Sequence, residues 1–220
     1  MFTVNYDELN IKYANLSPEQ RIVEMFKDFP SEKILFTSSF GTTAAILLHM
    51  ISKVNRNQKV YFLDTTYHFM ETLNYKNQLK ELLNLNIVDI KPEDWKNDFT
   101  TKDQTWTKDP DLCCSINKVE PLDVIKPNFD LWISGLMSNQ TSHRKQLDIF
   151  EQKSDITKFY PILDFTAEQA AEYFVKNNLP KHPLESMGYS SIGCAQCTAK
   201  GKGREGRWTN KSKTECGLHG

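Results

Sequence analysis

Residues 33–51 read KILFTSSFGTTAAILLHMI, and this stretch decides the fold class. Its start, 33–37, is a short apolar run with the length and composition of a buried strand. Its end, 44–51, has the apolar content of a helix that packs against a sheet, and the polar loop 38–43 joins the two. A strand that leads directly into a helix is typical of βαβ units, in which the strands are parallel.

The same alternation continues along the chain. Further strands are expected at 60–63, 87–90 and 131–134, with helices at 68–84 and from Thr166 to about Asn177. An earlier helix is expected after Ser17-Pro18-Glu19-Gln20, which supplies an N-cap, a first-turn proline and a capping-box Gln. The sequence therefore predicts one α/β domain over residues 1–200, a twisted parallel sheet with flanking helices, and a flexible C-terminal arm over 201–220.

Composition and charge exclude several classes of protein. The 220 residues are 39% hydrophobic with a net charge of −1, as in a globular protein without the basic footprint of a nucleic-acid binder. No run approaches the roughly 20 apolar residues of a membrane span, and residues 1–8 lack the pattern of a signal peptide. The odd number of cysteines also argues against a secreted disulfide framework. We expect a cytoplasmic protein without membrane or nucleic-acid partners, and a homo-oligomer is possible.

The loop that follows the first strand has the features of a nucleotide site. Loops between a strand and a helix bind ligands at the edge of open parallel sheets, and hydroxyls with free N–H groups at a helix N-terminus suit a phosphate. Ser38-Ser39-Phe40-Gly41 begins this loop, and Asp64 follows the next strand at the same edge. Neither the Walker pattern nor the three-glycine dinucleotide fingerprint is present. The two strand ends favour a nucleotide cleft, and a simple Ser/Thr helix cap is the alternative.

The five cysteines suggest a metal site and one further thiol. Cys113-Cys114 and Cys194-Ala195-Gln196-Cys197 are close pairs that could supply four thiolates to tetrahedral zinc or to an iron–sulfur cluster. Adjacent cysteines favour a cluster, whose separate irons give neighbouring thiolates separate targets. Lys118 would share a helix face with Cys114 if this stretch is α-helical. The alternative is a set of unrelated buried thiols.

The fifth thiol, Cys216, has the surroundings of a reactive cysteine. It ends a basic, glycine-rich segment, and nearby cations lower the pKa of a thiol. His219 is close enough in the sequence to act as an acid–base or orienting partner. We interpret this segment as a mobile arm that brings a nucleophile to an anionic substrate; a solvated tail with an idle cysteine is the alternative.

These motifs, in this order, resemble those of the assimilatory adenylyl-sulfate (APS) reductases, within the APS/PAPS reductase family of adenine-nucleotide α-hydrolase folds. The stretches that carry the resemblance extend over about residues 30–219 and include Ser38-Ser39-Phe40-Gly41, Asp64-Thr65, Cys113-Cys114 with Lys118, Ser134-Gly135-Leu136 with Arg144, 188–198 with its Cys-x-x-Cys, Gly206-Arg207-Trp208, and Glu215-Cys216-Gly217-Leu218-His219.

The resemblance implies a set of roles. One [4Fe–4S] cluster per chain would be held by Cys113, Cys114, Cys194 and Cys197, with Cys216 and His219 as catalytic residues. The implied substrate contacts are Ser38, Ser39, Phe40, Gly41, Asp64, Lys118, Gly135, Arg144, Arg204 and Arg207. The implied reaction is attack of the Cys216 thiolate on the sulfonyl sulfur of adenylyl sulfate, which expels AMP and leaves an S-sulfocysteine. Thioredoxin or a glutaredoxin-like dithiol then releases sulfite, since no resolving cysteine is left in the chain.

Two departures from the family pattern and three rival functions remain. Met137, Ser138 and Asn117 stand where relatives are more basic, which leaves the substrate contacts uncertain. The rivals are the same reaction on PAPS, an ATP-pyrophosphatase-type enzyme, and a non-catalytic iron–sulfur or zinc regulatory protein. Cluster-free PAPS reductases lack the cysteine pairs, and the Ser-Gly-Gly-x-Asp-Ser loop of the pyrophosphatases is absent, so reduction of adenylyl sulfate is favoured.

Overall fold

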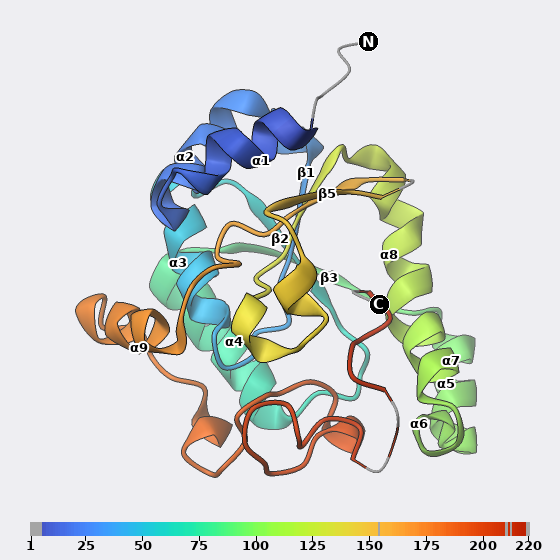
Figure 1. Ribbon diagram of the computed structural model, residues 1–220. Coiled ribbons are helices and arrows are strands. Elements are labelled where there is room, and N and C mark those ends of the chain that lie inside the picture. The colour runs from blue at the N-terminus through green and yellow to red at the C-terminus, as the bar shows by residue number, and fades with distance from the viewer. Residues whose placement is uncertain (1–5, 154, 210, 212, 219–220) are drawn as a thin grey trace.

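The computed structural model describes residues 6–153, 155–209, 211 and 213–218, and it shows a six-stranded sheet flanked by helices (Figure 1). The strands are β1 (Ile34–Thr37), β2 (Lys59–Leu63), β3 (Asn86–Ile90), β4 (Leu131–Ile133), β5 (Phe150–Gln152) and β6 (Thr157–Phe159). The helices are α1 (Tyr6–Ala14), α2 (Pro18–Asp28), α3 (Ala44–Val54), α4 (Met70–Leu83), α5 (Asp94–Asp103), α6 (Thr105–Lys108), α7 (Pro110–Cys114), α8 (Glu120–Ile125) and α9 (Ala167–Lys176).

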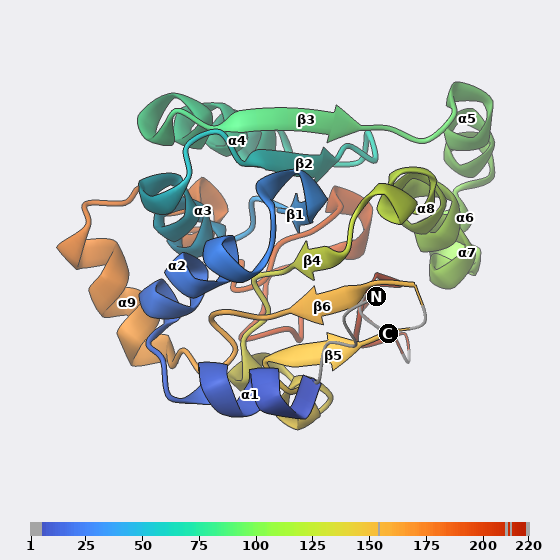
Figure 2. The ribbon, with the colours of Figure 1, turned by 90° about the horizontal axis from the view of Figure 1, so that it is seen from above.

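The strand order β3-β2-β1-β4-β6-β5 confirms the expected parallel sheet and adds one antiparallel edge (Figure 2). β1 pairs in parallel with β2 and β4, and β5 alone runs antiparallel, to β6. The sequence did not predict β5 and β6, because each has three residues of mixed polarity, unlike the equally short but wholly apolar β4. Asn10 of α1 covers the β5 edge by bonding both the N–H and the C=O of Phe150 at 2.8 and 3.0 Å, which protects an otherwise open strand.

Alternation along the central strands separates two apolar layers. Ile34 and Phe36 of β1 point into the larger core with residues of α2, α3, α4 and α9, whereas Leu35 points to the opposite face. There it joins Trp132 of β4, residues of α8, and Leu218 from the end of the chain. Side chains of a strand alternate between faces, so the end of the described chain forms part of the second layer.

Helix starts were predicted well where a side chain caps the helix. Ser17 with Gln20 and Thr166 with Gln169 form the capping boxes of α2 and α9. α3 differs, because Thr43 makes no side-chain cap bond at its N-terminus. The simple-cap alternative for this loop therefore has no support among the described contacts.

The cysteine-bearing stretch is helical but not uniformly α-helical. α7 ends at Cys114 and continues as a π-helical turn, Ser115–Val119, before α8. A π turn is wider than an α turn and is often found at functional sites, so the expected four-residue spacing from Cys114 to Lys118 does not apply strictly. Among the described residues, no helix is long and apolar enough to cross a membrane.

Arg21 ties the N-terminal helices to the end of the sheet, and its removal should weaken the fold. Its guanidinium is buried and bonds Asp164 at 2.6 and 2.8 Å and the carbonyl of Tyr13 at 2.9 Å. Arg21→Ala should lower the free energy of unfolding by about 2 kcal/mol, the loss of hydrogen bonds to a charged group, because the Asp164 side chain is 60% exposed and stays hydrated. Urea denaturation measures it, with Lys27→Ala, at an exposed pair with Glu24, as control. Equal losses in the two variants would contradict this role.

Candidate active site

A pocket of about 580 Å³ opens where β1, β2 and β4 end, a volume suited to a nucleotide. Loop 38–43 and the start of α3 form one wall, and residues after β4 and after α9 form others. Of the expected substrate and catalytic residues, those that line the pocket are Ser38, Ser39, Gly41, Lys118, Gly135, Arg144, Arg204, Arg207 and Cys216, and the expected metal ligand Cys194 lines it too. Segments far apart in the sequence thus meet at one sheet edge.

Phe40 and Asp64 take other positions. Phe40 has a positive φ of 50° and is fully buried, with its ring 5.6 Å from that of Phe62. This uncommon conformation turns the side chain into the core, so that Ser38, Ser39 and Gly41 line the pocket without it. Asp64 accepts a bond from the Thr66 N–H at 3.0 Å and faces Lys91 at 3.5 Å, outside the pocket lining. His219 lies outside the described residues.

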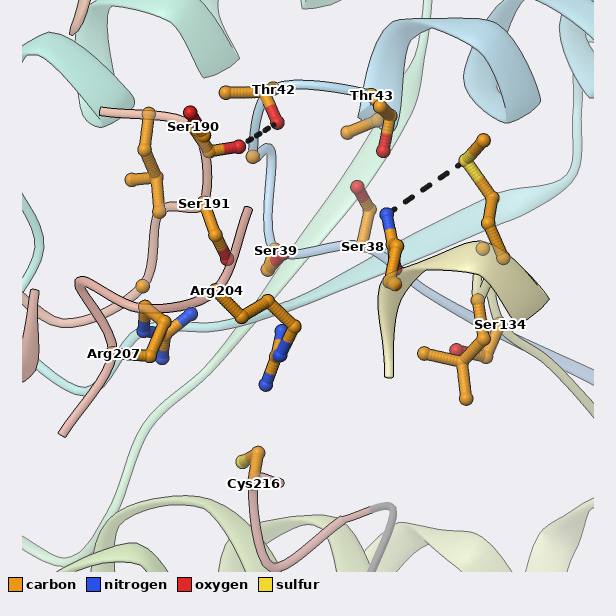
Figure 3. A pocket seen from close by; sticks show the side chains of 18 of the residues that line it. Ser38, Ser39, Thr42, Thr43, Ser134, Ser190, Ser191, Arg204, Arg207 and Cys216 are labelled. Carbon is orange, nitrogen blue, oxygen red and sulfur yellow. Dashed lines mark hydrogen bonds between the residues drawn. The ribbon is translucent and has the colours of Figure 1, made fainter. Parts of the chain in front are cut away.

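Two arginines lie in the pocket with donors that have no partner. Figure 3 shows the Arg204 and Arg207 side chains between the hydroxyl-bearing loop and Cys216. The Nε atoms of both are buried and bond nothing among the described residues. The Arg207 guanidinium lies over the Trp208 ring, 4.5 Å from its centre. Burial, and then Arg144, lower the pKa of Arg204 to about 10. Unpaired guanidinium donors in a nucleotide-sized pocket suit an anionic ligand.

Cys216 is partly exposed on the pocket wall, and its surroundings favour the thiolate. The pKa of Cys216 is lowered, first because the Cys114 thiol bonds to it and then by the charge of Lys118, although burial acts in the opposite direction. The pKa of Cys114 is raised by the same bond. For Lys118, burial opposes the charged form, but Cys194, Cys216 and Cys114 outweigh it and raise the pKa. Cys216 therefore stands beside a cation that stabilises its reactive form.

Arg144 is occupied by the chain itself. Its guanidinium forms a two-pronged pair with the Glu215 carboxylate, 2.9 Å from Nε to Oε1 and 2.7 Å from Nη2 to Oε2. Glu215 was not singled out as a site residue, although its place next to Cys216 was a signal. Arg144, expected on a substrate, is thus paired with the residue that precedes Cys216.

The four remaining cysteines line a second, small cavity. Cys113, Cys114 and Cys194 are buried and Cys197 is partly buried, and all four face this cavity together with Tyr67 and Trp106. Burial raises the pKa of Cys113 to about 11, and the facing Cys194 and Cys197 add to the effect. Lys118 lines this cavity as well as the larger pocket.

The arrangement of these thiols bears on the kind of metal group that they could hold. No group of three or more His, Cys, Asp or Glu side chains within the described ranges is arranged to hold one metal ion. A single zinc ion draws four sulfurs to about 2.3 Å from one centre, whereas the thiolates of an iron–sulfur cluster bind separate irons. The four thiols that line one cavity are a donor set for either kind of group, and the adjacent Cys113 and Cys114 suit separate irons.

Neighbouring polar groups are aimed at two of these thiols. Asn117 is buried and donates to Cys113 Sγ at 3.7 Å, and the Thr65 hydroxyl lies 3.4 Å from Cys194 Sγ. Asn117, a departure from the family pattern, is thus a buried partner of the cysteine site. Met137, another departure, packs against the main core and also lines the larger pocket.

Comparison with known proteins gives consistent matches. The phosphoadenosine phosphosulfate reductase domain matches residues 33–200. Proteins named adenosine 5′-phosphosulfate reductase are similar along most of their length: one from Bacillus thuringiensis (strain Al Hakam) is 39% identical over 203 residues, covering 88% of this chain and 86% of its own. One from Bacillus mycoides (strain KBAB4) is 38% identical over 202 residues, covering 86% and 84%.

Solved structures agree with the sheet. A phosphoadenylyl-sulfate (PAPS) reductase from Candida auris, in a phosphate complex, superposes with a TM-score of 0.75 at 27% identity, covering 88% of this chain and 95% of that one. An FMN adenylyltransferase from Candida glabrata superposes at 0.57 and 16% identity over 87% and 72%, and that likeness concerns the fold alone. The adenine-nucleotide α-hydrolase-like fold is thereby confirmed.

Gly193 should be required for the position of Arg207. A Cβ on Gly193 would lie 2.2 Å from Nη2 of Arg207, so a side chain there must displace the guanidinium. In a Cys216→Ser background, which prevents turnover, Gly193→Ala should weaken the binding of adenylyl sulfate about tenfold, and that of AMP less, through the loss of one charge-assisted contact. Calorimetry measures both affinities, and Arg207→Ala provides the reference background. If Gly193→Ala binds adenylyl sulfate like the parent, or weakens it equally in the absence of Arg207, the expected coupling does not exist.

Proposed function

The chain belongs to the phosphoadenosine phosphosulfate reductase domain family, and from this premise we propose that it reduces adenylyl sulfate to sulfite and AMP with Cys216 as the nucleophile. The observation that carries the proposal is the partly exposed Cys216 thiol in the wall of a nucleotide-sized pocket, beside Arg204 and Arg207. An anionic phosphosulfate needs such cations before a thiolate can approach it.

The nucleotide would occupy the end of the pocket formed by loop 38–43. No side chain caps α3, and the Ala44 and Ile46 N–H groups donate to the Gly41 and Thr43 carbonyls at 3.1 and 3.2 Å, so the Ala45 N–H is the donor proposed for a phosphate. Leu47, Phe174 and neighbouring alanines of α9 give this end an apolar wall suited to a purine. Thr42 bonds the Ser190 carbonyl at 3.2 Å, which joins the loop to the opposite wall (Figure 3).

The chemical steps follow from the thiol and its cations. The Cys216 thiolate forms a bond to the sulfonyl sulfur as the bond to the phosphate oxygen breaks, and AMP leaves with that electron pair. Arg204, Arg207 and Lys118 would offset the negative charge on the transferring group. An external dithiol of the thioredoxin or glutaredoxin class then attacks the Cys216 sulfur, releases sulfite, and becomes a disulfide as it supplies two electrons.

We further propose that Cys113, Cys114, Cys194 and Cys197 hold a [4Fe–4S] cluster. The shared cavity and its buried partners support this donor set. Bound there, the cluster would join two distant segments and add negative charge next to Lys118. Cys114 would then be a thiolate ligand with no proton to offer Cys216, so Lys118 and Arg207 would hold the Cys216 thiolate.

The domain division and the arm also remain proposals. Residues 201–218, where described, pack on the body: Trp208 N–H bonds the Cys197 carbonyl at 3.0 Å, and Gly206 lies against Ala199, with a 2.7 Å bond between them. Cys216 must meet both an enclosed substrate and a reducing protein. We therefore propose that the docked arm opens once per turnover, in the reducing environment of the cytoplasm.

The two cysteine pairs and the relatives named adenosine 5′-phosphosulfate reductase favour adenylyl sulfate over PAPS as the substrate. kcat/KM should therefore be higher for adenylyl sulfate.

Loss of the Cys216 thiol should separate binding from chemistry. With adenylyl sulfate and a dithiol, the parent protein should release sulfite, and Cys216→Ser should reduce the rate at least about a thousandfold, as expected for a lost nucleophile. AMP affinity should be unchanged, because the loop and the arginines bind the nucleotide. Sulfite release by the variant near the parent rate would remove Cys216 from the mechanism.

The cysteine site has its own test. Protein purified without oxygen should contain iron and inorganic sulfide at about four each per chain. Cys113→Ser and Cys194→Ser should lose both together with the visible absorbance, while Cys216→Ser keeps them. Stoichiometric zinc without sulfide would contradict the cluster.

A further inference from the structure

The segment that carries Cys216 is fixed immediately before the thiol by a buried carboxylate. Both Glu215 oxygens are used: Oε1 accepts from Arg144 Nε and from the Thr141 hydroxyl, each at 2.9 Å, and Oε2 accepts from Arg144 Nη2 at 2.7 Å and Arg204 Nη2 at 3.3 Å. The Arg144 and Glu215 side chains are each only 6% exposed. A buried charge is costly unless it is paired, so this segment has a strongly preferred position.

Arg144 has little freedom to serve another ligand. Its remaining Nη1 atom bonds the side chain of Gln140, and its own N–H bonds the Thr141 hydroxyl at 3.2 Å. Turning the guanidinium toward a substrate would leave Glu215 buried with only Thr141 and Arg204. The described geometry therefore favours a structural role for Arg144 at the pocket wall.

A second cation fixes the segment just after the thiol. Lys158 of β6 is buried, and its Nζ donates to the Leu218 carbonyl at 2.9 Å. The same Nζ lies 4.9 Å from the centre of the Trp132 ring, in the apolar layer that Leu218 joins. Burial, and then the charge of Lys153, lower the pKa of Lys158 to about 8. Burial disfavours the charged form of Lys158. The position of this lysine is therefore better explained by its contact with Leu218 than by a contribution to stability.

We propose that Arg144 and Lys158 are positioning residues that clamp residues 215–218 on both sides of Cys216 and so set where its thiol stands in the pocket. Between the two anchors lie only Cys216 and Gly217. A reacting atom misplaced by about 1 Å loses much of its rate, so a clamp on both neighbours has a direct chemical use. The effect on turnover rests on the proposed function, whereas the effect on the segment's mobility does not.

Amide hydrogen exchange of residues 213–218, followed by mass spectrometry on the protein as purified, tests the clamp directly. Glu215→Gln keeps the shape but removes the charge, and Arg144→Met removes the donors. Each should raise exchange at least about tenfold, the effect of losing a charge-assisted pair. The double variant should resemble either single one, because both disrupt the same pair.

Lys158→Met tests the second anchor and separates positioning from stability. It keeps an apolar stem of similar length and removes the donor to Leu218. Exchange of 213–218 should rise while the urea midpoint stays equal or increases, because a buried cation is lost. Lys27→Met, at an exposed side chain of α2, should change neither. If the urea midpoint of Lys158→Met fell together with the exchange protection of residues 213–218, Lys158 would have only a structural role. That result would overturn the proposal for the second anchor.

Ligand binding and turnover distinguish the clamp from a substrate contact. With the clamp, Arg144→Met and Glu215→Gln keep the AMP affinity, and kcat for sulfite release falls while KM stays near the parent value. A different result would overturn the proposal: if Arg144→Met lost affinity for AMP or adenylyl sulfate while Glu215→Gln kept it, Arg144 would be a substrate contact. Unchanged exchange in both variants would also overturn it. If the parent released no sulfite, the proposed function would fail, and the exchange result would still decide the clamp.

Discussion

The buried pair of Arg144 and Glu215 is the constraint on which the site depends. Either charge would be costly if it were buried without its partner. The segment that carries Glu215 must therefore pack against the loop after β4, which carries Arg144. That return brings Leu218 into the layer under β1 and β4 and places Cys216 in the pocket wall. The position of the reactive thiol thus follows from an ion pair one residue away.

The same pair divides the positive charge of the pocket into two uses. Arg144 forms its ion pair within the chain, with Glu215. Arg204 and Arg207, in contrast, retain buried Nε donors without partners among the described residues. Lys118 lies at the boundary of the two cavities, where it faces both the cysteine pairs and Cys216. A substrate anion would therefore find its cations already in place. Charges that are preorganised in this way commonly contribute more to the rate of an enzyme than any other single effect.

The sequence was informative where neighbouring residues determine the local structure and where the residue types indicate a site. The strand–loop–helix of 33–51 and the capping boxes at Ser17 and Thr166 depend on neighbouring residues, and they were predicted correctly. Both cysteine pairs were expected at one site, and all four thiols line the same cavity. The family resemblance added the expected roles of the arginines, of which only the positions in the pocket wall can be compared with the structure.

Other features depend on distant contacts or on small backbone changes. The three-residue strands β5 and β6 exist because they pair with each other and with β4, not because of any pattern of their own. Phe40 was expected at the substrate, but its positive φ turns it into the core.

The most direct measurement of the central claim is mass spectrometry of the protein after incubation with adenylyl sulfate and no dithiol. The account predicts stoichiometric AMP release and a sulfonate on the peptide that contains Cys216. AMP release with that peptide unmodified, or with the sulfonate on another cysteine, would contradict it.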